Sequence, residues 1–163
     1  MRSKQITFIA LFIGIMLLFY GFYITPFFQN NILFPISCWD ARVAAWVLQL
    51  FGQQTSAIGD VVQNTKFSIS IKAGCDALQP IALFSVAMLA YPIAFRLKWK
   101  WLLLGIILLL LLNIVRIITL FLIGSYGNTT LFELFHFEIW QVTFIVFALL
   151  LFAWMMQRIL SKV

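Results

Sequence analysis

The chain has 163 residues, of which 64% are hydrophobic and only 10% are charged, so its apolar side chains exceed what a water-surrounded core of this size can hide. This composition predicts a membrane protein and excludes an ordinary soluble enzyme. The net charge of +6 comes from basic residues that flank the apolar segments. It therefore indicates membrane orientation, and we expect no nucleic-acid partner.

Four apolar segments are long enough to cross the hydrocarbon layer, which takes roughly 20 helical residues. They cover residues 6–25, 77–95, 101–123 and 139–156, and they predict one all-α membrane domain over residues 1–163, a four-transmembrane-helix bundle. The first segment is too long for a typical signal peptide and lacks a small-residue cleavage site after it, so we expect it to stay uncleaved.

Lysine and arginine residues in the short flanks predict the orientation of this bundle. One side carries Arg2, Lys4, Arg96, Lys98, Lys100, Arg158 and Lys162, and the other carries Arg42, Lys66 and Lys72. The richer side is expected to be cytoplasmic, with both termini on it. The acidic residues all fall on the opposite, external side.

Residues 26–74 form the one sizeable segment predicted outside the membrane. Residues 38–51 place apolar side chains at helical spacing with polar ones between them, which predicts an amphipathic helix lying in the membrane interface. Between residues 58 and 71 the apolar period changes to two around a polar turn, which predicts a small β-hairpin. The hairpin leads the chain directly to Cys75.

Arg116 lies inside the third apolar segment, where a charged side chain costs at least about 2.5 kcal/mol on insertion scales. Such a residue is expected to face a protein interior and to serve a function there. Asn113 and Thr119 lie three residues to either side of Arg116, so the three side chains share one face of the helix. We expect that face to line a buried polar pocket near the external end of the span.

Cys75 and His136 are two further candidates at the same membrane face. Cys75 precedes a predicted helix, whose positive end lowers the pKa of a nearby thiol. An ionised Asp76 close to the sulfur would raise that pKa, so we expect this carboxylate to be turned away as the helix cap. His136 stands just ahead of the fourth span. A thiol nucleophile needs a base and acyl transfer needs a donor to the oxyanion, and Cys75, His136 and Arg116 supply these needs.

The motifs that carry these residues resemble those of the exosortase and archaeosortase family of membrane cysteine transpeptidases. They are Cys75 at the head of one span, Asn113-Ile-Val-Arg116 within the next, and Phe135-His136 ahead of the last. The resemblance covers residues 70–141. It implies that Cys75 is a nucleophile that forms a thioester, that Arg116 stabilises charge or orients the thiolate, and that His136 is the general acid and base.

The same resemblance implies the substrates and the compartment. The substrates would be membrane-anchored proteins with a C-terminal sorting signal made of a motif, a transmembrane helix and a basic tail. They would be cut on the external face of a prokaryotic cytoplasmic membrane, and some members transfer the new end to a lipid or other acceptor, such as a glycan. The chain departs from many members at Asp76 and Ala77, where they have Ser or Asn followed by Gly. No metal and no soluble cofactor is required by this chemistry.

Two other interpretations involve the cysteines. Cys38 and Cys75 are both predicted to be external, where a structural disulfide between them is the ordinary expectation. The same pair would be needed for a thiol–disulfide oxidoreductase, although the chain has no Cys-x-x-Cys motif.

The acidic residues beside His136 leave further alternatives. Glu133 and Glu138 would form a metal site with the histidine, or one of them would fix its tautomer. In a non-enzymatic membrane subunit or a small transporter, Arg116 would pair with one of these glutamates for stability or would gate an anion path.

Overall fold

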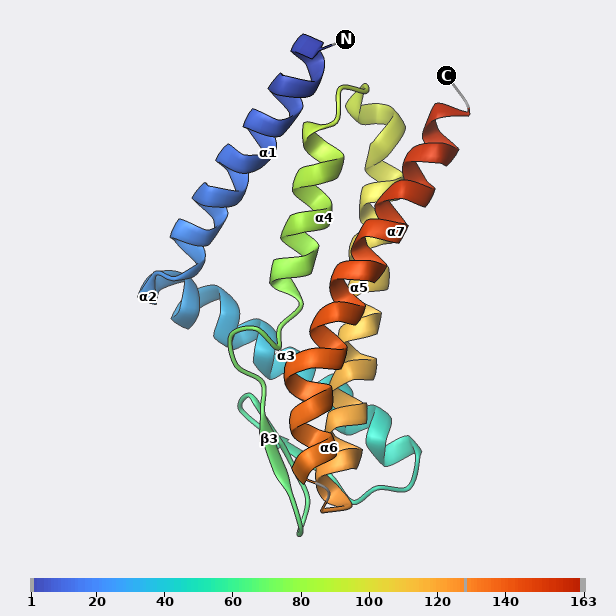
Figure 1. Ribbon diagram of the computed structural model, residues 1–163. Coiled ribbons are helices and arrows are strands. Elements are labelled where there is room, and N and C mark those ends of the chain that lie inside the picture. Colours follow the sequence, from blue (N-terminus) through green and yellow to red (C-terminus); the bar gives the residue numbers. More distant parts are fainter. Residues whose placement is uncertain (1, 128, 162–163) are drawn as a thin grey trace.

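The computed structural model describes residues 2–127 and 129–161, which form a helical bundle with a small sheet at one end (Figure 1). The elements in chain order are α1 (Arg2–Tyr23), α2 (Pro26–Phe28), the π-helical stretch η1 (Gln29–Leu33), α3 (Phe34–Leu50), β1 (Ser56–Ile58), β2 (Val61–Gln63), β3 (Ser68–Ser70), α4 (Leu78–Ala90), α5 (Phe95–Ser125), α6 (Thr129–Leu134), the π-helical stretch η2 (Phe135–Ile139) and α7 (Trp140–Leu160).

Three of the described helical segments are long and apolar enough to cross a membrane. They are Gln5–Tyr23 in α1, Phe95–Ser125 as α5, and Thr130–Leu160, which runs through α6, η2 and α7. These segments confirm the first, third and fourth predicted spans. The second predicted span, residues 77–95, is helical only over the 13 residues of α4. Thirteen residues rise about 20 Å, less than the roughly 30 Å of the hydrocarbon core, so the count of four spanning helices is not confirmed.

The short length of α4 has a local cause at its C-terminal end. Tyr91 precedes Pro92 and is extended, with φ −66° and ψ 131°, as the proline ring favours. The Lys98 side chain is buried beneath this end and donates to the carbonyl oxygens of Met88, Leu89 and Tyr91 at 2.8, 2.9 and 2.9 Å. A cation in this position satisfies the last carbonyls and complements the helix dipole.

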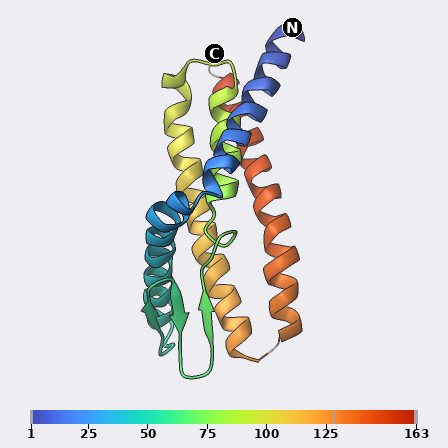
Figure 2. The same cartoon turned by 90° about the vertical axis from the view of Figure 1, so that its left-hand side faces the viewer.

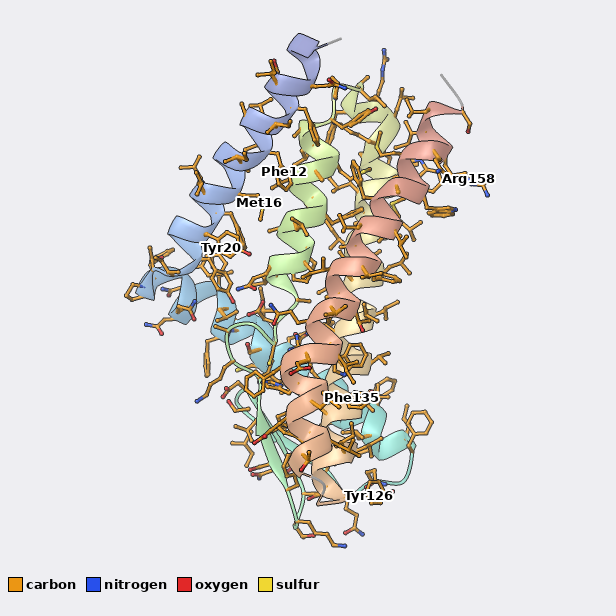
Figure 3. All side chains as sticks on the ribbon, in the orientation of Figure 1. Phe12, Met16, Tyr20, Tyr126, Phe135 and Arg158 are labelled. Carbon is orange, nitrogen blue, oxygen red and sulfur yellow. The ribbon has the colours of Figure 1, made fainter. Side chains whose placement is uncertain are left out.

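Helix α4 packs against α1, α5 and α7 in one half of the bundle (Figures 1 and 2). Its close approach to α5 depends on Gly105, because a Cβ atom there would overlap the ring of Phe84. Helix α1 packs along one face only, on which Phe12 and Met16 lie toward α4 (Figure 3). Among the described side chains of α1, Tyr23 alone is buried. Most of α1 is therefore left to the lipid.

Helix α3 confirms that the segment between the first two predicted spans contains a helix, and it buries a polar residue that an interfacial helix would leave on its surface. Trp39 and Trp46 are 54% and 59% exposed, whereas Asp40 is 1% exposed. The inward face carries Ala41, Ala44 and Ala45. Small side chains let α3 approach α5 closely, and Asp40 finds a partner there. The interfacial amphipathic helix is therefore not confirmed, since α3 contributes its polar Asp40 to the core.

The predicted hairpin is part of a larger sheet. Strands β2 and β3 pair as expected, and β1 adds a third antiparallel strand in the order β1-β2-β3. Strand β1 has three residues, like β2 and β3, but its sequence Ser-Ala-Ile shows no alternation of apolar and polar side chains by which it could be recognised.

The turn between β2 and β3 fixes the sheet to the end of α5. Asn64 Oδ1 accepts hydrogen bonds from the backbone amides of Lys66 and Phe67 at 2.8 and 2.7 Å, and its Nδ2 donates to Ser125 Oγ at 3.3 Å. The Phe67 ring lies against Gly124, where a Cβ atom would overlap it. After β3, which contacts α5, the chain continues through residues 71–77 to the start of α4.

The two ends of the chain lie at one end of the bundle, and the sheet with the α5–α6 connection lies at the other (Figures 1 and 2). Helix α3 and the sheet pack against the half of α5 that α4 does not reach. The segment from β3 to α4 passes between these two halves. It carries Cys75 past α5 and toward η2.

Candidate active site

Cys75 lies in a tight turn before α4. Gly74 has φ +90° and Ala77 has φ +58°, both in the left-handed region, which glycine adopts readily and other residues rarely do. The Cys75 amide donates to the carbonyl oxygen of Lys72 at 2.8 Å, and the cysteine is half-buried. The helix itself begins three residues later, at Leu78, so Cys75 lies one residue farther from it than the predicted boundary at residue 77 implied.

Arg116 approaches this turn from α5 and is 7% exposed. One terminal nitrogen, Nη1, donates to the Gly74 carbonyl oxygen at 3.0 Å, and the other, Nη2, lies 3.7 Å from Cys75 Sγ. The guanidinium carbon lies 5.6 Å from the centre of the Phe144 ring of α7, within cation–π range. The predicted intramembrane charge is therefore directed at the cysteine turn.

His136 reaches the same sulfur from η2, with Nδ1 at 4.0 Å from Cys75 Sγ. Its ring stacks on Phe132, with centroids 5.6 Å apart and an interplanar angle of 8°, and meets the edge of Phe137 at 4.6 Å. The sequence placed His136 ahead of the fourth span, but it lies inside the continuous segment Thr130–Leu160. The extra residue of a π-helical turn re-aims side chains, and such turns recur at functional sites.

The Cys75 thiol has a higher pKa than an ordinary cysteine, which contradicts the depressed value expected from a helix N-terminus. Burial is the largest cause; the positive charge of Arg116 lowers the pKa, and the negative charge of Asp76 raises it. The physical reason for the error is that α4 begins only at Leu78, whose amide is bonded to Asp76. The resting sulfur is therefore a protonated thiol that needs a base.

Asp76 and Tyr23 form a buried pair behind the cysteine. Asp76 Oδ1 accepts from the Leu78 amide at 2.7 Å, as expected of a capping residue, and its Oδ2 accepts from the Tyr23 hydroxyl at 2.8 Å. Tyr23 could not be selected from the sequence, because it ends an apolar span and lies 53 residues before Asp76 in the chain. The carboxylate is held toward α1 and the start of α4.

Asn113 is buried one turn before Arg116, but it bonds to a residue that the sequence analysis did not select. Its Nδ2 donates to Asp40 Oδ2 of α3 at 2.9 Å. Burial raises the pKa of Asp40 to about 6, and the nearby charge of Asp76 adds to this rise, although the Asn113 hydrogen bond opposes it. Asp40 was assigned to the polar face of an interfacial helix, where a buried amide partner on α5 could not be foreseen.

Thr119, Glu133 and Glu138 do not join the cluster. The Thr119 hydroxyl donates to the Val115 carbonyl oxygen of its own helix at 2.7 Å. Glu133 and Glu138 are exposed, and the described contacts of His136 include neither of them. The expected pairing of Arg116 with a glutamate is therefore absent from the described contacts, because the guanidinium is directed at the cysteine turn instead.

The two cysteines are both free thiols, Cys38 on α3 and Cys75 in its turn. The structural disulfide considered from sequence is therefore not formed. Among residues 2–127 and 129–161, no three histidine, cysteine, aspartate or glutamate side chains are grouped to hold a metal ion.

A groove of about 260 Å³ opens beside the cluster. Gly74 and Arg116 line its inner end, and Tyr20, Gln79 and Gln141 contribute polar side chains from α1, α4 and α7. A ligand in this groove would have direct access to the residues that hold the cysteine turn.

The fold and this cluster define a membrane protein with a thiol, an imidazole and a guanidinium gathered at one buried turn. Residues 3–154 match the family model of the transmembrane exosortases (Exosortase_EpsH). The chain therefore belongs to the transmembrane exosortase family. Neither a curated protein nor a solved structure matches it.

Proposed function

We propose that the protein is a membrane-embedded cysteine peptidase or transpeptidase that cleaves the C-terminal sorting signal of exported, membrane-tethered proteins. The observation that carries this proposal is the position of Cys75 Sγ, 4.0 Å from His136 Nδ1 and 3.7 Å from Arg116 Nη2. A nucleophile, a base and a cation within contact of one sulfur are what acyl transfer requires. Membership of the exosortase family supports the same assignment.

In the proposed reaction, His136 takes the proton from the Cys75 thiol, and the thiolate attacks the carbonyl carbon of the scissile peptide bond. The negative charge that develops on sulfur and then on the carbonyl oxygen is stabilised by Arg116. His136 then gives its proton to the departing amine, which leaves a thioester on Cys75. Water or an amine or hydroxyl of an acceptor next attacks the thioester and releases the thiol.

The raised pKa of Cys75 supports the need for this base. Because the neutral thiol predominates at neutral pH, attack depends on proton transfer at the moment that substrate is in place. His136 is oriented for that transfer by Phe132 and Phe137, which hold its ring from the face and the edge.

The proposed substrates are membrane-anchored proteins that carry a motif, a transmembrane helix and a basic tail. The groove beside Arg116 supports entry from the bilayer, because its lining comes from the apolar helices α1, α4, α5 and α7 and from the turn before α4. We place the site on the external face of a prokaryotic cytoplasmic membrane, and the acceptor in the transfer reaction is proposed to be a lipid or a glycan.

The test is co-expression with a tagged membrane protein that carries such a C-terminal signal, followed by detection of the shortened product. Cys75→Ala, Arg116→Ala and His136→Ala are each expected to abolish processing while the variants still insert in the membrane. Cys38→Ala is the matched control and is expected to process normally, because Cys38 lies on α3 outside the cluster. Processing at the wild-type rate by Cys75→Ala would refute the proposal.

A further inference from the structure

Gly74, the residue that precedes Cys75, is held through both its backbone amide and its backbone carbonyl group. The Gly74 amide donates to Tyr23 Oη and to Asp76 Oδ2, each at 3.1 Å, and the Gly74 carbonyl oxygen accepts from Arg116 Nη1 at 3.0 Å. Gly74 is in the left-handed conformation, so this orientation of the peptide has a backbone cost for any other residue. The orientation of the Gly74 carbonyl group determines where the guanidinium group of Arg116 binds.

Tyr23 and Asp76 hold the backbone amide of Gly74. The Tyr23 hydroxyl donates to Asp76 Oδ2 at 2.8 Å while its oxygen accepts from Gly74. Tyr23 is 4% exposed and Asp76 is fully buried, so water does not compete for these hydrogen bonds. Tyr23 is also the last residue of α1 and the one buried side chain among those described in that helix, and it links α1 to the cysteine turn.

We propose that Tyr23 and Asp76 are positioning residues for the Cys75 nucleophile. They hold Gly74 so that one nitrogen of Arg116 rests on its carbonyl oxygen while the other rests on the sulfur. This inference depends on the proposed function, in which Cys75 attacks the substrate. The two residues act through Gly74 and Arg116, and their described hydrogen bonds do not include the sulfur.

The two residues are expected to have opposite effects on the thiol. Asp76 supplies a negative charge that raises the pKa of Cys75, so its neutral isostere lowers that pKa. Tyr23 disperses the charge of Asp76 through its hydrogen bond and keeps Gly74 on Arg116. Loss of the Tyr23 hydroxyl therefore strengthens the repulsion between the Asp76 carboxylate and the Cys75 thiolate. It also loosens the contact of Arg116 with the cysteine turn. Both changes raise the pKa of Cys75.

The groups that act on this thiol come from every element around it. They are Asp76 in its own turn, Arg116 of α5, His136 of η2, Tyr23 of α1 through Asp76, and Asp40 of α3, whose carboxylate interacts with that of Asp76.

The test is the rate of Cys75 alkylation by iodoacetamide as a function of pH, in protein that carries Cys38→Ala and is purified in detergent. At pH 7.5 we expect Asp76→Asn to react about fivefold faster than the parent and Tyr23→Phe about fivefold slower, because the rate follows the thiolate fraction. Tyr126→Phe, at an 82% exposed position, is the matched control and is expected to leave the profile unchanged.

The opposite signs separate positioning from simple loosening. A turn that merely became more open would speed alkylation in both variants, and that result would overturn the inference. So would a Tyr23→Phe profile equal to that of Tyr126→Phe. If Tyr23→Phe does not fold, the pH profile of Asp76→Asn carries the test. A fall in the apparent pKa of Cys75 supports the inference, whereas a faster rate at every pH without a change in that pKa, or an unchanged rate, overturns it. Because no substrate is used, these results stand apart from any failure to detect processing.

Discussion

Arg116 is the residue through which the geometry of the site is set. Its two terminal nitrogens make separate contacts, one with the Gly74 carbonyl oxygen and one with Cys75 Sγ, while Phe144 supports its guanidinium. Such a forked contact is specific to arginine, because a lysine ammonium is a single point charge on a flexible stem.

Arg116→Lys is therefore expected to fail although it keeps the charge. We expect kcat/KM for processing to fall by about a hundredfold or more, the usual cost of losing a donor to transition-state charge. The pKa of Cys75 should rise in Arg116→Ala, which removes the charge that lowers it, and should change less in Arg116→Lys, which keeps that charge. Processing of the tagged substrate and the pH profile of alkylation measure the two effects. Arg42→Lys, on the exposed side of α3, is the control. Wild-type processing by Arg116→Lys would contradict this role.

Residue types and membrane depth were enough to select Cys75, Arg116 and His136, and the structure brings these three together. The same reasoning could not find Tyr23, because the role of its hydroxyl as a hydrogen-bond donor to Asp76 depends on α1 ending beside that residue. The same reasoning selected Thr119 for the site, because helical spacing does not reveal that its hydroxyl donates to a carbonyl oxygen of its own helix.

At the scale of elements, the contact between α3 and α5 depends on a buried acid. Asp40 and Asn113 are 1% and 0% exposed, and each keeps one buried oxygen, Oδ1, outside any described hydrogen bond. The carboxyl is more stable there with its proton. This contact therefore ties the packing of α3 to pH.

We expect the stability of the protein to fall between about pH 4 and pH 6, and Asp40→Asn to remove this fall. The folded-state pKa of about 6 is above the ordinary 3.8, so the folded protein holds the proton more tightly than the unfolded chain. Stability is thus highest below pH 4, declines as pH rises to 6, and stays lower above it, by about 3 kcal/mol in total. An asparagine at position 40 carries no charge and offers an amide donor for Asn113 Oδ1.

Thermal unfolding in detergent from pH 4 to pH 8 measures this effect. At pH 7.5, Asp40→Asn should melt at a higher temperature than the parent. The control Glu133→Gln, at an exposed position, should melt at the same temperature as the parent. A parent whose melting temperature is flat across this range, together with a lower value for Asp40→Asn, would show that the charge is not costly at this position.

The elements differ in how far the sequence predicted them. Long apolar runs gave α1, α5 and α7, because a helix of that length and composition has few alternatives in lipid. The length of α4 was overestimated, since apolar composition continues past Ala90 while Pro92 ends the helix. The buried face of α3 was not foreseen, because the helix was expected to lie in the membrane interface, whereas close packing on α5 selected alanines.

For the whole molecule, the position of the termini constrains the path through the membrane. Three spanning helices alone would leave the two ends of a chain on opposite faces, yet both ends lie at one end of this bundle (Figure 1). We infer that the chain returns a further time, through the turn at Cys75 and the short helix α4. Such a path, part turn and part helix, would keep the nucleophile inside the bundle instead of on a surface loop.

This path predicts that both termini are cytoplasmic and that the α5–α6 connection is external, as the distribution of lysine and arginine requires. Arg158 lies near one end of the bundle and Tyr126 at the other (Figure 3). In a background of Cys38→Ala and Cys75→Ala, we expect an impermeant maleimide to label Tyr126→Cys in intact cells. Ser161→Cys, at the residue directly after the end of α7, should be labelled only after the membrane is permeabilised. The opposite result, with Ser161→Cys labelled in intact cells and Tyr126→Cys protected, would show that the molecule has the inverse orientation. The groove and the cysteine turn would then lie nearer the cytoplasm, where an exported substrate does not present its external motif.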